Sequence, residues 1–123
     1  MKITTLRTGI IGTFLMALII GTGCMSVLAG QQEQVVKMTA KRFEYSPKEI
    51  TLKKGVPAVL EITALDRLHG FDCPDLGIRA DLLPGKVTKV RFTPQKTGSF
   101  TFHCDIFCGD GHEDMAGTIT VRE

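Results

Sequence analysis

An all-β sandwich is the fold class that this 123-residue sequence predicts, and three observations support it. Apolar and polar residues alternate with a period of two in several short segments after residue 34. Glycine or proline separates many of these segments. No stretch after residue 34 keeps the 3.6-residue period of a helix. Short alternating segments of this kind are typical of two-sheet β domains.

The alternation locates the strands in chain order. The predicted strands are residues 35–40, 49–52, 58–65, 89–92, 98–103 and 117–121. In the third strand Leu60, Ile62 and Ala64 share one face. In the fifth strand Phe100 and Phe102 share a face that we expect to be buried. The core of the domain should therefore lie between two sheets.

Length and composition limit the function classes. Hydrophobic residues make up 43% of the chain and charged residues 23%, which is an ordinary globular balance and argues against disorder. A chain of this length holds one small domain and excludes a two-domain enzyme. Beyond the first 29 residues the chain carries thirteen cationic and thirteen acidic side chains, so nothing indicates a nucleic-acid partner.

The first 29 residues are predicted to be a signal peptide or membrane anchor that precedes a domain at 30–123. Lys2 and Arg7 form a positive start, and residues 10–20 are almost continuously apolar, which predicts a leader helix. Cleavage after Ala29 is the preferred outcome, and lipidation at Cys24 or retention as an anchor are the alternatives. Each outcome predicts a periplasmic or other extracytoplasmic domain, secreted across or anchored to the cytoplasmic membrane.

Four potential metal ligands are concentrated in twelve residues near the end of the chain. They follow the spacing C-x3-C-x3-H-x2-M and are Cys104, Cys108, His112 and Met115. His69 is a further imidazole upstream. Soft sulfur ligands favour Cu(I), and imidazole also suits Cu(II), so the set predicts a copper site that keeps its ligands in both oxidation states. Such a site suits one-electron transfer.

Other interpretations of the same residues remain open at this stage. Cys104 and Cys108 could form a disulfide in an oxidising compartment, although the loop that it closes is very short. A mononuclear copper site could use Cys108, His112, Met115 and His69. Structural zinc could use Cys104, Cys108, His112 and His69, which leaves Met115 unexplained. Cys73 is interpreted as a buried core thiol.

The predicted strands bring the ligands together. His69 follows the strand at 58–65, whereas residues 104–115 fill the loop between the last two strands, so both should meet at one end of the sandwich. That loop contains Gly109 and Gly111 and no proline, which allows a tight wrap around a metal.

These motifs resemble the binuclear CuA domain of cytochrome c oxidase subunit II and of nitrous oxide reductase. The resemblance rests on the C-x3-C-x3-H-x2-M motif with its upstream histidine and covers most of residues 35–122. Further matching segments are residues 66–71, 74–78 and 83–86 for subunit II and residues 107–117 for the reductase. The resemblance implies a Greek-key β-sandwich of the cupredoxin type.

The resemblance also implies a role for each ligand. Cys104 and Cys108 would bridge two copper ions as thiolates, and His69 and His112 would each cap one copper. Met115 and the backbone carbonyl of Ile106 would be weak axial ligands. The implied function is one-electron transfer by a non-enzymatic carrier, and the alternative is copper storage or delivery.

Residue 106 departs from the oxidase pattern. Subunit II generally has a glutamate there whose side chain helps to bind magnesium, and Ile106 offers no such side chain. The chain therefore resembles a free-standing CuA-like protein more than an orthodox oxidase subunit.

The charge pattern suggests a partner. Acidic residues flank the predicted ligands, whereas many of the cations, Arg42 among them, fall in the opening strands. An acidic copper end would steer a basic redox partner such as a c-type cytochrome.

Overall fold

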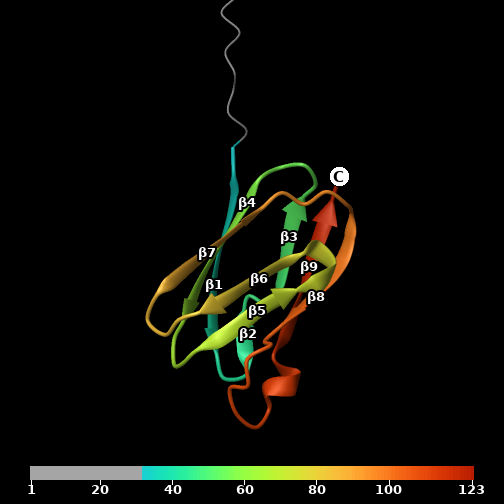
Figure 1. The fold of residues 1–123 in the computed structure, drawn as a ribbon. Helices are drawn as coiled ribbons and strands as arrows, with labels where there is room; N and C mark the ends of the chain where they lie inside the picture. Colours follow the sequence, from blue (N-terminus) through green and yellow to red (C-terminus); the bar gives the residue numbers. More distant parts are fainter. Residues whose placement is uncertain (1–31) are drawn as a thin grey trace, which may run out of the picture.

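Residues 32–123 are described by the computed structural model, and they form two β-sheets packed face to face (Figure 1). The predicted leader at 1–29, with its helix and Cys24, lies outside the described residues. Within residues 32–123 there is no helix of the length and apolarity that a membrane crossing requires.

Nine strands and two short 3-10 turns make up the described part of the chain. The strands are β1 (Gln34–Lys41), β2 (Glu44–Ser46), β3 (Glu49–Lys53), β4 (Ala58–Ala64), β5 (His69–Cys73), β6 (Ile78–Leu82), β7 (Val87–Phe92), β8 (Gly98–His103) and β9 (Ala116–Arg122). The 3-10 turns are η1 (Pro74–Leu76) and η2 (His112–Asp114). The predicted all-β class is confirmed.

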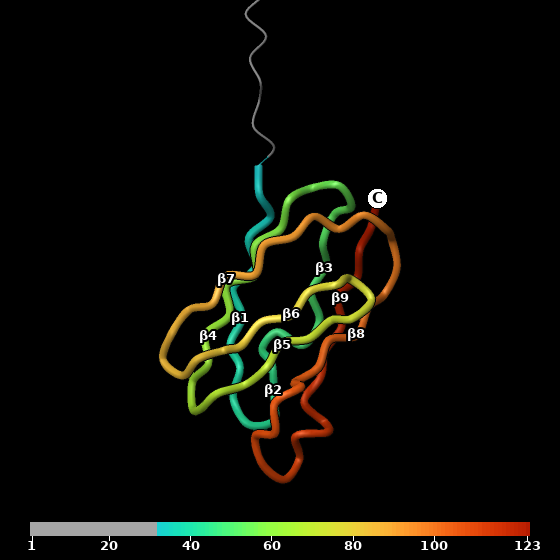
Figure 2. The backbone as a smooth tube through the Cα atoms, viewed as in Figure 1, coloured from blue at the N-terminus to red at the C-terminus, as the bar shows by residue number. Residues whose placement is uncertain are grey.

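The chain passes repeatedly from one sheet to the other. One sheet has the order β2-β1-β4-β7 and the other has the order β3-β9-β8-β5-β6. The pairs β1–β4 and β3–β9 are parallel, and the remaining pairs are antiparallel. Figure 2 shows the crossings, for example from β2 to β3 and from β4 to β5. Such crossings between sheets are typical of Greek-key sandwiches.

All six predicted strands are present, with bounds that differ by a few residues. Three strands, β2, β5 and β6, were not predicted. Strand β2 has only three residues, which is too short for a periodic signal. Strand β5 is buried at four of its five positions, so it lacks the alternation that marks a half-buried strand. His69 therefore begins a strand instead of only following one.

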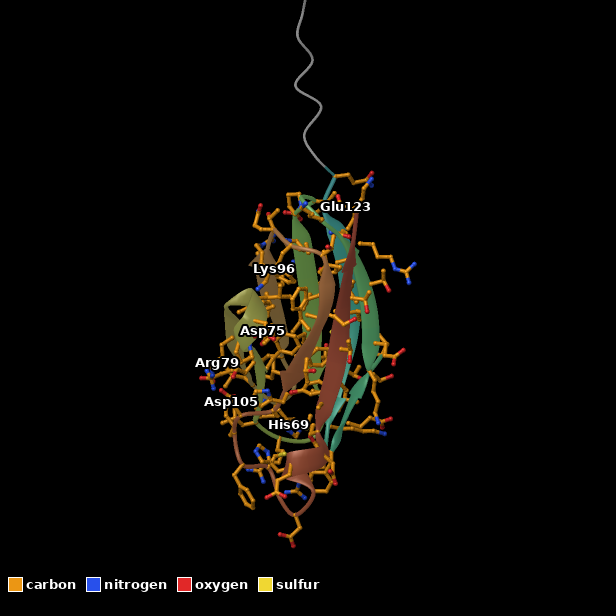
Figure 3. The ribbon with its side chains drawn as sticks, turned by 90° about the vertical axis from the view of Figure 1, so that its right-hand side faces the viewer. His69, Asp75, Arg79, Lys96, Asp105 and Glu123 are labelled. Atoms are coloured by element: carbon orange, nitrogen blue, oxygen red, sulfur yellow. The ribbon has the colours of Figure 1, made fainter. Side chains whose placement is uncertain are left out.

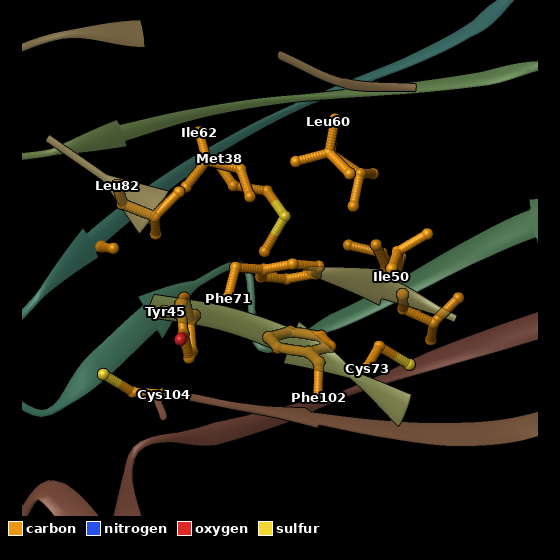
Figure 4. Close-up of a cluster of buried hydrophobic side chains, with 14 of the residues drawn as sticks. Met38, Tyr45, Ile50, Leu60, Ile62, Phe71, Cys73, Leu82, Phe102 and Cys104 are labelled. Carbon is orange, nitrogen blue, oxygen red and sulfur yellow. The ribbon is translucent and has the colours of Figure 1, made fainter. Parts of the chain in front are cut away.

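The core between the sheets is centred on three aromatic rings. The ring centroids of Phe71 and Phe102 lie 4.8 Å apart, and those of Tyr45 and Phe102 lie 5.0 Å apart. Figure 4 shows this cluster with Cys104 at one edge and Cys73 at another. The interpretation of Cys73 as a buried core thiol is confirmed, because its side chain is fully buried among apolar neighbours.

Residues 104–115 lie at the end of the sandwich opposite the C-terminus and the point where the described chain begins (Figure 1). Figure 3 shows that His69 and Asp105 lie toward this end, whereas Lys96 and Glu123 lie toward the other. The predicted meeting of His69 with the ligand loop thus follows from the fold.

Candidate metal centre

Two thiols and an imidazole form the centre of the cluster. One ligand atom each of His69, Cys104 and Cys108 lies within 4.8 Å of the other two. The two sulfur atoms are 4.0 Å apart, and both cysteines are free thiols. The disulfide considered from the sequence is therefore absent from this arrangement.

The other three predicted site residues lie around the same thiols. His112 Nδ1 is 3.5 Å from Cys108 Sγ, and Met115 Sδ is 3.9 Å from that sulfur. The Ile106 carbonyl oxygen is 3.1 Å from Cys104 Sγ. The structure thus brings together all six residues that the sequence singled out, with extra donors beside each of the two thiols.

Backbone contacts fold the ligand loop back on itself. Cys104 follows β8 directly, and its N–H donates to the Met115 carbonyl across a distance of 3.0 Å, which joins the two ends of the loop. The short η2 turn carries His112, and the Met115 N–H donates to the His112 carbonyl. Proposed ligands eleven positions apart in the sequence are therefore held side by side.

Glycine is needed at two positions in this loop. Gly109 and Gly111 have φ values of 133° and 106°, which residues with side chains rarely adopt. A Cβ on Gly111 would lie 3.0 Å from the ring of Phe43, and one on Gly109 would lie 3.2 Å from it. The loop can therefore pack closely on Phe43 only with glycine at these positions.

His69 has one ring nitrogen occupied and one available. Its imidazole is fully buried, and Nε2 lies 2.7 Å from Oδ1 of Asp66. Nδ1 is buried and has no hydrogen-bond partner. A buried polar atom without a partner is costly unless something binds it. The thiols of Cys104 and Cys108 lie within 4.8 Å of a nitrogen of this ring. Soft thiols beside an imidazole suit a thiophilic metal such as copper, so the residues present fit the metal that the sequence predicts.

Hydrogen bonds keep Asp66 ionised. Burial alone would raise the pKa of this carboxyl, but hydrogen bonds from the Arg42 N–H, the His69 ring and the Arg67 N–H lower it. An ionised carboxylate only accepts, so Nε2 of His69 donates to it and Nδ1 is the ring nitrogen left for another partner. In a neutral imidazole this hydrogen bond selects the tautomer that a metal bound at Nδ1 requires.

The Cys108 thiol is protonated at neutral pH when no metal is bound. Burial, followed by the proximity of Cys104, raises the pKa of the Cys108 thiol to about 11. The Gly70 N–H lies 3.4 Å from Cys104 Sγ, where it can donate to a thiolate. Metal binding must therefore displace the Cys108 proton, whereas the hydrogen bond to Cys104 Sγ is already in place for a bound thiolate.

Three residues at the site were missed by the sequence interpretation. Tyr45 is fully buried beneath it, and its hydroxyl donates to the Gly70 carbonyl at 2.5 Å. Arg42 and Arg67 reach the Cys108 carbonyl at 3.0 and 3.3 Å. A lone tyrosine and two arginines have no motif, and only the fold brings them beside the ligands.

These arginines correct the expected charge pattern. Arg42 was grouped with the basic opening strands, but its guanidinium lies at the ligand end. Arg79 also reaches this end and pairs with Asp105 at 2.5 Å. Asp75, an acidic residue two positions after Cys73, lies nearer the middle of the sandwich than His69 and Asp105 do (Figure 3). The ligand end therefore carries both signs of charge.

A family model described as the cupredoxin-like domain matches residues 13–121. The chain belongs to this family. The two-sheet sandwich with its ligand loop at one end agrees with that membership.

Two relatives show which copper proteins this cupredoxin domain is similar to in sequence. Over 97 residues the chain is 37% identical to cytochrome c oxidase subunit 2 of Thermus thermophilus, which covers 79% of this chain and 72% of that protein. Over 92 residues it is 29% identical to nitrous-oxide reductase of Pseudomonas fluorescens. That match covers 72% of this chain but only 14% of the reductase.

Solved structures show the same fold. The periplasmic domain of subunit II of cytochrome oxidase (CoxB) of Bradyrhizobium japonicum superposes with a TM-score of 0.66 at 23% identity, over 73% of this chain and 84% of that one. The metal-binding domain of the Cu(I)-exporting ATPase CopA of Streptococcus pneumoniae D39, solved with Cu(I), gives a TM-score of 0.63 at 26% identity. That comparison covers 76% of this chain and 90% of the other.

Proposed function

We propose that this protein is an exported one-electron carrier with a binuclear CuA-like copper centre. Its ligands would be His69, Cys104, the Ile106 carbonyl, Cys108, His112 and Met115. Two copper ions held there would supply a single redox-active electron. The protein residues would hold the ligand geometry constant, which lowers the barrier to electron transfer.

The proposal rests on the number of potential donor atoms and on how they are distributed between the two thiols. Six donors are more than a four-coordinate metal ion uses. The carbonyl of Ile106 lies against Cys104, whereas His112 and Met115 lie against Cys108, and the two thiols are 4.0 Å apart. A pair of thiols with separate donors on each is the ligand set that two ions sharing two thiolates require.

Burial of the donors favours electron transfer over substrate chemistry. His69, Cys108 and Met115 are fully buried, so a substrate has little direct access to them. Catalytic metal sites instead keep an open position. The proposal therefore includes no turnover of a substrate by this chain.

Copper loading of reduced protein tests the proposal. We expect two copper ions per chain, a purple colour and the EPR spectrum of one unpaired electron delocalised over both ions. A single copper per chain would indicate the mononuclear site, and preferential binding of zinc in competition would indicate a structural metal. Cys104→Ser serves as the matched variant, because it removes one proposed bridge and should abolish the delocalised spectrum.

Copper delivery is the second candidate, and the likeness to the CopA domain solved with Cu(I) favours it. The same thiols and thioether could bind Cu(I) without redox cycling. Incubation of the Cu(I) form with a copper-free acceptor protein separates the two functions. Rapid transfer of metal together with a colourless oxidised product would support delivery, whereas a retained purple centre would support electron transfer.

The proposed partner is a c-type cytochrome or another redox protein outside the cytoplasm. Phe107 is 69% exposed, and its ring centroid is 5.8 Å from that of the proposed ligand His112, so an apolar contact surface adjoins the site. Acidic Asp110, Glu113 and Asp114 are exposed in the same loop. Electron-transfer rates with a basic cytochrome should fall as salt rises, and a flat response would exclude steering by these charges.

A further inference from the structure

Two arginines from separate loops converge on one carbonyl of the ligand loop. Arg42 lies between β1 and β2, and its Nε donates to the Cys108 carbonyl at 3.0 Å. Arg67 lies between β4 and β5, and its Nη1 donates to the same oxygen at 3.3 Å. Nη2 of Arg67 also reaches the Phe107 carbonyl at 3.5 Å. The backbone at a proposed bridging ligand is thus held by two cations.

This arrangement compensates for the lack of a strand at Cys108. The residue lies outside the β-ladders, so its carbonyl has no strand partner. A carbonyl oxygen has two lone pairs, and the two guanidinium groups can use both. Hydrogen bonds from charged donors are roughly twice as strong as neutral ones. The pair can therefore fix the position of Cys108 in a loop that contains two glycines.

A single carboxylate connects both arginines to His69. The backbone N–H of Arg42 donates to Asp66 Oδ2 at 2.8 Å, and that of Arg67 donates to Asp66 Oδ1 at 2.8 Å. The ring of His69 bonds to Oδ1 of the same group. Two loops and a proposed ligand therefore share one hydrogen-bonded network. This network fixes the backbone from which both arginine side chains extend.

The two guanidinium groups place positive charge at the Cys108 backbone, and therefore near a proposed bridging thiolate. Arg67 is half-buried, and its Nε is buried without a partner, so water screens this cation incompletely. A nearby positive charge favours whichever redox state of the centre carries less positive charge. Reduction adds one electron and lowers that charge, so both arginines stabilise the reduced state.

We propose that Arg42 and Arg67 are positioning residues of the metal centre, which hold the Cys108 backbone and raise the reduction potential of the bound copper. The predicted effect on the reduction potential rests on the proposed copper function. The positioning of the Cys108 backbone concerns the metal-free protein and can be tested without copper.

Four variants separate charge from geometry. Arg42→Gln and Arg67→Gln remove the charge, whereas Arg42→Lys and Arg67→Lys keep it on a side chain without the planar guanidinium. The matched control is Arg91→Gln on β7, which removes an exposed cation that pairs with Glu33 at 3.0 Å at the far end of the sandwich. If one glutamine variant fails to fold, the lysine variant at that position still tests the positioning role, and the glutamine variant of the other arginine tests the effect of charge.

The first measurement uses metal-free reduced protein and NMR order parameters of amides in residues 107–110. We expect order parameters of about 0.85 in the parent protein and in the Arg91→Gln control. In the four variants of Arg42 and Arg67 they should fall toward about 0.6. Unchanged order parameters would overturn the positioning role, whatever metal the protein binds.

The second measurement is a redox titration of copper-loaded protein. At a fixed applied potential, each glutamine variant should raise the ratio of oxidised to reduced centre by roughly threefold to tenfold, whereas the lysine variants and Arg91→Gln should stay near the parent. Equal potentials in the glutamine variants and the control would overturn the electrostatic role. A parent protein that forms no binuclear centre would instead refute the proposed function, while the order parameters still decide the positioning role.

Discussion

His69 and Asp66 are joined by a 2.7 Å hydrogen bond that leaves the other ring nitrogen of the histidine buried and without a partner. The carboxylate lies three residues before the histidine and also accepts two backbone N–H groups. It therefore orients the ring and connects it to neighbouring loops. Carboxylates in this position commonly set the affinity of a histidine for its metal.

Replacing this carboxylate should weaken copper binding while the fold persists. In Asp66→Asn the amide no longer enforces the Nε2–H tautomer, so we expect a loss of roughly 10- to 100-fold in Cu(I) affinity. Competition with a chromophoric Cu(I) chelator measures the change. Asp110→Asn is the control, because it removes an exposed carboxylate from the ligand loop. Equal affinities for Asp66→Asn and the parent would contradict the role of Asp66.

Gly70 permits the close approach of Asp105, the residue that follows Cys104. A Cβ at Gly70 would overlap the Asp105 carboxylate. Gly70→Ala should therefore lower the free energy of unfolding by about 1–3 kcal/mol, as overpacking commonly does. Urea denaturation of the copper-free protein measures it.

A double-mutant cycle identifies the clash. Asp105→Ala removes the overlapping carboxylate, so Gly70→Ala should cost much less in that background. If the two effects simply add, the cost of Gly70→Ala arises elsewhere in β5.

The ion pair between Arg79 and Asp105 makes the stability of the fold depend on pH. The hydrogen bond from Arg79 lowers the pKa of this carboxyl below its ordinary value of 3.8. A lowered pKa in the folded state gives stability that is present above pH 3.8 and is lost as pH falls through the folded-state pKa. Because the pair is partly exposed, we expect roughly 0.2–1 kcal/mol.

Chemical denaturation from pH 7 down to acid checks this value. Asp105→Asn should be less stable than the parent at neutral pH and should approach it in acid. Asp110→Asn should run parallel to the parent throughout. If the free energies of unfolding of Asp105→Asn and the parent differ by the same amount at every pH, ionisation of Asp105 contributes no pH-dependent stability.

Cys73 should be dispensable for copper binding. Its thiol is fully buried in the core, and burial raises its pKa. Cys73→Ala should keep two copper ions per chain and cost about 1 kcal/mol of stability, because it leaves a small cavity. Metal analysis and thermal unfolding give both numbers, and loss of copper would refute its assignment as a core residue.

Alkylation tests the same assignment in the parent protein. Cys73 should react with iodoacetamide only after the protein unfolds, because the reactive form is the thiolate and the side chain is inaccessible. Modification of Cys73 in native protein at neutral pH would show that this part of the core opens readily.

Much of the fold was predictable from sequence because its strands are half-buried. Alternation located β4 and β8, where residues such as Ile62 and Phe102 face the core. Alternation did not reveal β5, which is buried on both faces and therefore shows no period of two. Strand β2, which contains the buried Tyr45, has only three residues and is too short to show the alternation.

The proposed ligand set was predicted from the sequence itself. Five of the six proposed ligands were recognisable because thiols, imidazoles and a thioether at that spacing have few other uses, and their chemistry is independent of the fold. Ile106 was implied only by resemblance, since a backbone carbonyl has no signature in sequence.

Tertiary structure alone decided what surrounds those ligands. Tyr45 beneath Gly70 and the arginine pair on the Cys108 carbonyl join residues from different loops or strands, and the turn before β5 aims Asp66 at His69. Such contacts depend on distance and direction in space, which residue type and spacing do not encode. The sequence thus specified the donors, and the packing of two sheets determined the network that holds them.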